Sequence, residues 1–249
     1  DQLRALDEVE NIIFMAGAKF GTAGRPELLE LMNVEVPRRV AEKFRHSRIT
    51  AFSTGCVYSY YPVDSSGPTE EQETAPVGAY AQSCLGREQA FLEGARRHGT
   101  PVSLIRLNYA VEFRYGVPVD LAVKLRAGDP IDVTMGHANI IWQRDAIIHS
   151  LLAHELASSD GFILNVTRPE VLRIRDMATR LGELLDCEPR FTGSEAPTAW
   201  ISNSSKAVRL FGEPETHVDT ILQYVAAWQL EQLPILGKPS GFDKRDGNF

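Results

Sequence analysis

The alternation of short apolar runs with helix-length amphipathic segments constrains the fold of this chain more than any other feature. The predicted strands are residues 11–17, 49–55 and 101–108. Between them, apolar residues recur with helical spacing over 27–46 and 79–98. Pro37 bends or restarts the first of these helices, and Gly99 ends the second. Strands and helices in this order form a parallel sheet through right-handed crossovers, with helices on both faces, so the sequence predicts a doubly wound α/β fold.

The second half of the chain repeats the strand–helix order less regularly, which predicts a smaller α/β lobe. We place the main domain at residues 1–165, with 112–138 contributing to the lobe, and the lobe itself at 166–235. The Gly-rich, charged tail 236–249 is either loose or docked on a partner. Ligands of open α/β sheets bind at the carboxyl ends of the strands, and we expect the lobe to cover that edge.

Composition argues against several classes of function. Of the 249 residues, 43% are hydrophobic and 24% charged, which is ordinary for a soluble globular protein. The net charge of −7 argues against a broad nucleic-acid or anionic-membrane surface. No apolar run reaches the roughly 18 residues of a membrane span. The 3 cysteines are odd in number and lack metal-ligand spacing, so we expect no metal, no disulfide framework and a reduced, cytoplasmic protein.

Seven short segments follow one another in an order that is more specific than any of them alone. They are FMAGAKFG (14–21), MNVEV (32–36), FSTGCVYS (52–59), YAQSC (80–84), LIRLNYAV (104–111), IIWQRDAI (140–147) and SNSSKAVRLFG (202–212). In this order they resemble motifs of the extended short-chain dehydrogenases/reductases, the NAD-dependent epimerase/dehydratase family. The first segment is particularly similar to that of UDP-galactose 4-epimerases. The resemblance implies a Rossmann-like, dinucleotide-binding main domain and a substrate-binding lobe.

The Tyr-x-x-x-Lys motif of that family falls on Tyr80, but a cysteine, Cys84, stands at the lysine position. By resemblance, Tyr80 is the general base that removes a proton from a substrate hydroxyl during hydride transfer, and Thr54 orients the reacting oxygen. The unperturbed pKa of tyrosine is about 10, so only roughly one phenol in a thousand is ionised at pH 7. A lysine one helical turn away favours the tyrosinate, whereas a thiol is neutral and a poor donor.

The resemblance also assigns neighbouring residues to cofactor and substrate. It implies that the cofactor is bound by Met15, Ala16, Gly17, Lys19, Asn33, Ser53, Tyr80 and Asn108, and the substrate by Thr54, Asn108, Tyr109 and Trp142. We expect Lys19 or the oxidised nicotinamide ring to supply the positive charge that Tyr80 needs. Arg87 lies on roughly the same helix face, two turns away. Simpler roles stay open: Cys84 fills a helix interface, Asn33 ties its helix to a loop, and Trp142 packs in a core.

The Gly-rich turn G-x-x-G-x-x-G, which brings the pyrophosphate to a helix N-terminus in this family, does not occur in the sequence. The chain begins at Asp1 in the middle of the strand–helix pattern. We therefore expect roughly 65 further residues, the first strands and this turn, to precede it in the natural protein. The residue that separates NAD from NADP would lie there, so either cofactor fits the sequence.

Two functions from different classes follow from these observations. The first is an NAD(P)-dependent epimerase, dehydratase or dehydrogenase that acts on a sugar or nucleotide-sugar. The second is a catalytically silent dinucleotide-binding or assembly protein that kept the fold without the lysine. The resemblance also implies a homodimer, in which helices 27–46 and 79–98 of both subunits form a four-helix bundle.

Overall fold

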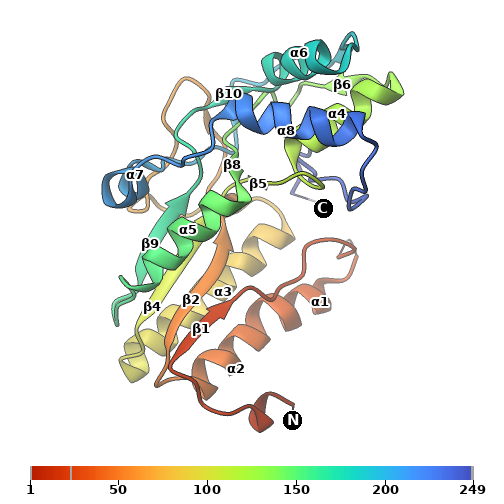
Figure 1. The fold of residues 1–249 in the computed structure, drawn as a ribbon. Coiled ribbons are helices and arrows are strands. Elements are labelled where there is room, and N and C mark those ends of the chain that lie inside the picture. The colour runs from red at the N-terminus through yellow and green to blue at the C-terminus, as the bar shows by residue number, and fades with distance from the viewer. Residues whose placement is uncertain (1, 23, 248–249) are drawn as a thin grey trace.

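The main domain is built on a four-stranded parallel sheet. A computed structural model describes residues 2–22 and 24–247. The strands are β1 (Asn11–Phe14), β2 (Arg48–Thr54), β4 (Val102–Leu107) and β9 (Phe162–Val166), in the spatial order β1-β2-β4-β9 (Figure 1). The register places Thr54 beside Leu107 and Leu107 beside Val166. The carboxyl ends of β2, β4 and β9 therefore meet at one edge of the sheet.

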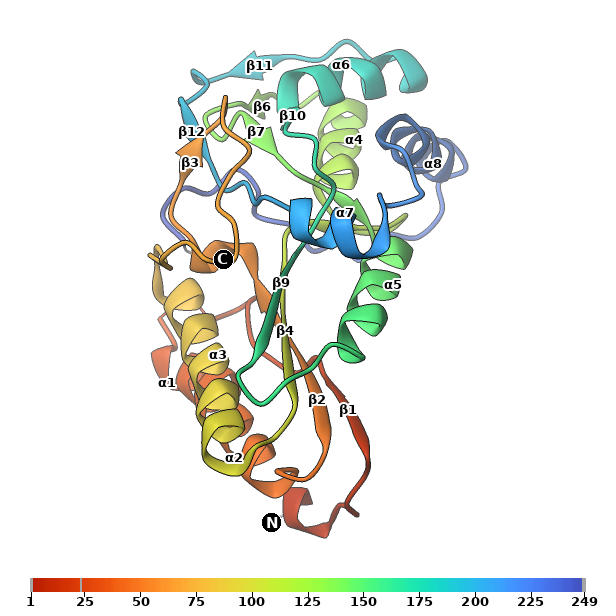
Figure 2. The same ribbon diagram turned by 90° about the vertical axis from the view of Figure 1, so that its left-hand side faces the viewer.

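Helices cover both faces of this sheet, as the sequence predicted (Figure 2). One face carries α1 (Pro26–Glu30), the π-helical turn η2 (Leu31–Glu35), α2 (Val36–Lys43) and α3 (Ala79–His98). The other carries α5 (Gln143–His154), and α7 (Ser205–Phe211) contacts β9. Phe14 of β1 meets Phe91 of α3 edge to face, with ring centroids 5.1 Å apart. Gly99, with a φ of 71°, ends α3 where expected.

The segment predicted as one helix over 27–46 consists of α1, η2 and α2 in direct succession. Pro37 has no backbone N–H, so the carbonyl four residues earlier, at Asn33, receives no bond from it. The wider π turn accommodates this carbonyl, and α2 restarts with Pro37 in its first turn. Pro37 thus restarts the helix without separating its two parts.

Two glycines allow α3 to lie close against this broken helix. A Cβ added at Gly86 would lie 2.8 Å from a Val34 methyl carbon. One added at Gly94 would lie 3.1 Å from the Cβ of Ala41. The close approach holds α3, and with it Tyr80, in a fixed position against η2 and α2.

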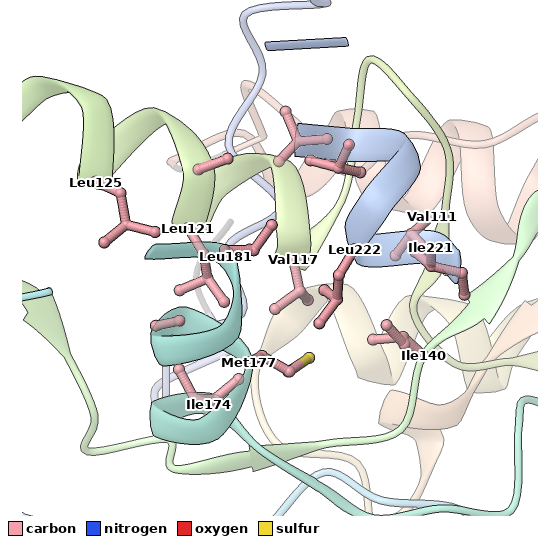
Figure 3. Packing of buried hydrophobic residues seen from close by; sticks show 14 of the residues in the cluster. Val111, Val117, Leu121, Leu125, Ile140, Ile174, Met177, Leu181, Ile221 and Leu222 are labelled. Atoms are coloured by element: carbon pink, nitrogen blue, oxygen red, sulfur yellow. The ribbon is translucent and has the colours of Figure 1, made fainter. Parts of the chain in front are cut away.

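The lobe has its own core, formed by three helices. These are α4 (Val117–Ala127), α6 (Ile174–Leu185) and α8 (Val218–Leu230). Figure 3 shows Leu121 of α4, Leu181 of α6 and Leu222 of α8 pointing into this core. Because α4 packs with α6 and α8, residues 112–138 contribute to the lobe.

Short strand pairs join the lobe to the sheet domain. They are β5 (Ala110–Val111) with β8 (Ile141–Trp142), β7 (His137–Ala138) with β10 (Leu172–Arg173), β6 (Ile131–Asp132) with β11 (Phe191–Thr192), and β3 (Tyr61–Pro62) with β12 (Thr198–Ala199). The last pair was not predicted, because β3 lies in a polar loop without alternating apolar residues. A one-turn 3-10 helix, η3 (Gly55–Val57), follows β2.

The C-terminal tail packs on its own chain, so the expectation of a loose or partner-docked tail was wrong. Phe242 is 2% exposed and belongs to the lobe core. The backbone N–H of Leu236 donates to the Arg114 carbonyl at 3.1 Å, and the Arg245 guanidinium donates to the Thr198 carbonyl at 2.7 Å. A large buried aromatic ring outweighs the polar composition that suggested a free tail.

Within residues 2–22 and 24–247, no helix has the length and apolarity that a membrane crossing requires. The same residues contain no cluster of three or more His, Cys, Asp or Glu side chains suited to a metal ion.

Candidate active site

A cavity of about 210 Å³ lies at the carboxyl edge of the sheet, between the strand ends and the start of α4. Its lining residues are Lys19, Ser53, Thr54, Cys56, Tyr80, Leu107, Asn108, Tyr109, Ala110, Val111, Tyr115, Gly116 and Ser240. Six of these were predicted site residues, and they come from four separate segments of the chain. The fold therefore brings together Lys19, Ser53, Thr54, Tyr80, Asn108 and Tyr109 at the edge where such sheets bind ligands.

Thr54 and Asn108 reach the cavity because each stands where a central strand ends. Thr54 is the last residue of β2, and its Oγ1 accepts a hydrogen bond from the Cys56 backbone N–H at 3.2 Å. Asn108 follows β4, and its backbone N–H donates to the Val166 carbonyl at 3.0 Å. Gly55 lies between them, where a Cβ would be 3.1 Å from the Asn108 side chain. Only glycine lets the two strand ends approach this closely.

Tyr109 enters the cavity through an unusual backbone conformation. Its φ of 42° lies in the left-handed region, which is uncommon for residues other than glycine. Such strain is often retained at functional sites. Burial raises the pKa of Tyr109 well above its ordinary value, so the ring presents a neutral phenol.

Tyr80 lies in the first turn of α3, with Cys84 one turn later beneath it. Cys84 is fully buried, packed with Val57 and Tyr58, and burial raises its pKa to about 11. Burial also raises the pKa of Tyr80 well above its ordinary value, and its hydrogen bond with Cys84 raises it further. At neutral pH both groups are protonated, so the resting site holds a phenol and a thiol.

Lys19 belongs to the loop after β1 and lies close to Tyr80. Its Nζ is 5.8 Å from the centroid of the Tyr80 ring and donates to the Ser240 carbonyl at 3.1 Å. Burial lowers the pKa of Lys19, while nearby Cys56, Cys84 and Asp120 partly oppose that shift. The Ser240 backbone N–H and Oγ both donate to Asp120 Oδ2, at 2.7 and 2.6 Å. Lys19 thus links the sheet domain to the tail and α4.

Asn33, on η2, holds the loop after β1 in place. Its Oδ1 accepts the Ala18 backbone N–H and its Nδ2 donates to the Ala18 carbonyl, both at 2.8 Å. Its Nδ2 also donates to Ser83 Oγ on α3 at 2.8 Å. This is the tie between helix and loop that was one of the two roles considered for Asn33. The side chain is fully buried beneath the loop and does not line the cavity.

A buried network behind the cavity was missed from the sequence. Glu88 of α3 accepts two hydrogen bonds from Arg106 of β4, at 3.0 and 2.8 Å, and a third from Ser53 Oγ at 2.6 Å. Arg106 also donates to the Tyr58 hydroxyl at 2.7 Å, which in turn donates to Asn165 Oδ1 of β9 at 2.9 Å. The signal was a charged residue, Arg106, inside an otherwise apolar strand.

The remaining predicted residues lie outside the cavity. Met15, Ala16 and Gly17 form an exposed stretch at the end of β1. Trp142 is buried in the lobe, where its ring meets Phe113 edge to face at 4.9 Å. The packing role considered for Trp142 matches this position.

The sheet order, the overlying lobe and the cavity define a Rossmann-like α/β protein of the extended short-chain dehydrogenase/reductase type. No family model and no curated protein sequence matches the chain. Solved structures do match its fold. One is a UDP-galactose 4-epimerase, with a TM-score of 0.74 and 20% identity over 93% of this chain and 82% of that chain.

Two further structures are similar to the chain. MoeE5 in complex with UDP-glucose and NAD has a TM-score of 0.76 and 14% identity, over 92% of this chain and 84% of that one. UDP-glucuronic acid 4-epimerase from Bacillus cereus in complex with NAD has a TM-score of 0.78 and 16% identity, over 92% and 75%. The chain therefore has the fold of the NAD-dependent sugar-nucleotide epimerases that its motifs resemble.

The residues at the cavity suit the nicotinamide end of a dinucleotide. The cavity offers hydroxyl groups, the Asn108 amide and the Lys19 ammonium, which are hydrogen-bonding partners for a carboxamide and a ribose. One ribose ligand of the family is absent, because Cys84 stands where the lysine would bind. The sequence given does not contain the Gly-rich turn for the pyrophosphate.

Proposed function

We propose that this protein is an NAD(P)-dependent epimerase/dehydratase or dehydrogenase that acts on a nucleotide-sugar. The observation that carries the proposal is the convergence of Thr54, Tyr80 and Asn108 on one cavity at the carboxyl edge of the sheet. The bound UDP-glucose and NAD of the similar structure MoeE5 support this choice of ligands. Cofactor contacts come from Met15, Ala16, Gly17 and Lys19, and from the further residues Asn33, Ser53, Tyr80 and Asn108.

In this proposal the nicotinamide, when bound, accepts or returns a hydride. Tyr80 exchanges a proton with the substrate oxygen, and Thr54 and Asn108 hold that oxygen within reach. Tyr109 lines the substrate side, and the lobe around Trp142 shapes it. A tyrosine of pKa about 10 needs roughly 4 kcal/mol to ionise at pH 7. Because Tyr80 starts from a still higher pKa, its phenol first acts as a proton donor and needs a nearby positive charge to act as a base.

A calorimetric titration with NAD⁺, and separately with NADP⁺, tests the proposal on the complete natural protein. We expect binding in the micromolar range and turnover of a UDP-sugar, with turnover lost in Tyr80→Phe. Tyr224→Phe is the matched control, because it removes a hydroxyl from a partly exposed tyrosine on α8. The absence of binding at millimolar concentrations of both dinucleotides would refute the proposal.

The alternative is a catalytically silent protein with the same fold, and Cys84 is the observation that favours it. Binding of NAD⁺ without turnover of any UDP-sugar would support this second function. We also propose a cytoplasmic homodimer formed through α2 and α3. Sedimentation of the protein as a monomer at micromolar concentration would argue against that assembly.

A further inference from the structure

Arg87 is a buried cation on the catalytic helix, and the proposed chemistry has not assigned it a role. It lies on α3 three residues after Cys84 and seven after Tyr80, so all three share one face of the helix. Its side chain is 7% exposed. Among the residues that the structure describes, no carboxylate lies within ion-pairing distance of its guanidinium. A buried charge without a counter-ion is unfavourable unless function requires it.

Neutral groups hold the guanidinium in place. One terminal nitrogen donates to the Phe52 carbonyl of β2 at 2.9 Å, and the other donates to Asn33 Oδ1 at 2.6 Å. Gly17 provides the space, because a Cβ there would lie 2.2 Å from the terminal nitrogen. The Nε is buried without a hydrogen-bond partner in the described part of the chain. Three segments thus fix the position of this cation, and none of them neutralises it.

We propose that Arg87 is a positioning residue that supplies Tyr80 with the positive charge that lysine supplies in the Tyr-x-x-x-Lys motif. The inference rests on the proposed role of Tyr80 as the proton-transferring group. The neighbouring carboxylate, Glu88, is already paired with Arg106. Arg87 therefore keeps its full charge for the Tyr80 and Cys84 side of the helix.

The electrostatics of the site agree with this assignment. The Arg87 charge lowers the pKa of Tyr80 and of Cys84, against the larger opposing effect of burial. The other titratable groups that face Tyr80 are Cys84 on α3, Cys56 on η3 and Lys19 from the loop after β1. Both thiols raise the pKa of Tyr80, so they cannot replace the missing lysine.

The test measures the pKa of residue 80 directly, in the full-length chain without cofactor or substrate. Replacement of Tyr80 by 3,5-difluorotyrosine gives a more acidic phenol, whose ionisation is followed by fluorine NMR. We expect Arg87→Gln to raise this pKa by about one unit, the low end of the effect of an opposite charge nearby. Arg87→Lys should restore most of the shift. Arg96→Gln, an exposed arginine on the same helix, is the matched control and should change nothing.

A folded Arg87→Gln variant with an unchanged pKa at residue 80 would overturn the inference. If Arg87→Gln does not fold, the double variant Cys84→Lys/Arg87→Gln decides, because it moves the cation to the family position. A folded double variant with the wild-type pKa supports the charge role. Failure of the double variant to fold overturns it, because Arg87 would then be needed for its hydrogen bonds. The NAD⁺ titration tests the proposed function separately, since this pKa is measured without any ligand.

Discussion

Removal of the carboxylate at the centre of the buried network gives the sharpest test of what holds the site together. Glu88 and Arg106 have side chains only 2% and 5% exposed. Glu88→Gln keeps the size of the side chain but leaves the Arg106 guanidinium buried without a counter-ion. Breaking a buried pair on one side costs about 3–5 kcal/mol. We therefore expect the free energy of unfolding to fall by about that amount.

The measurement is urea unfolding followed by far-UV circular dichroism. Tryptophan fluorescence is less suitable, because Trp142, Trp200 and Trp228 all lie in the second half of the chain. The matched control is Glu155→Gln, which breaks the exposed pair with Arg48 and should change stability by no more than about 1 kcal/mol. The double variant Glu88→Gln/Arg106→Met removes the stranded charge and should recover part of the loss. A Glu88→Gln variant as stable as the control would refute the reasoning.

Two further perturbations test the tail and the pH dependence of stability. Phe242→Ala should lower the free energy of unfolding by about 3–5 kcal/mol in the same assay, whereas Lys244→Ala, an exposed neighbour, should have little effect; equal effects would mean that the ring does not anchor the tail. Burial lowers the pKa of His154, whose ring bonds Thr50 and Asn11, so the folded state binds fewer protons than the unfolded state below pH 6.5. Wild type should therefore lose about 1 kcal/mol or less relative to His154→Gln between pH 7 and pH 5, and parallel stability curves would contradict this.

The layer architecture could be predicted from the sequence because the strands and helices of the main domain have distinct apolar periods. The runs at 11–17, 49–55 and 101–108 gave β1, β2 and β4 with ends displaced by one to three residues. The seven ordered motifs predicted the fold family, which the similar structures confirm. Six of the predicted site residues line one cavity, because motif residues at strand ends converge wherever parallel strands end together.

What could not be predicted depends on contacts between distant segments. The polar loop around Tyr61 forms a strand only because residues 198–199 pair with it. The tail docks through Phe242, whose cavity is made by three lobe helices that no local pattern reveals. The network of Glu88 and Arg106 requires the register of α3 against β4. Charged residues inside apolar segments were the available signal, and a single sequence does not show which charges pair.

Cys84 and Arg87 are best understood together as one change to the catalytic helix. A lysine at position 84 would place a second cation in the buried region where the Arg87 charge already acts. Two like charges in such a region raise each other's free energy, so the helix accommodates one of them more readily than both. A small neutral residue at 84 is therefore what a buried arginine at 87 requires. On this argument Cys84→Lys alone should destabilise the fold, whereas the same change beside Arg87→Gln should be tolerated, and urea unfolding of the two variants separates these outcomes.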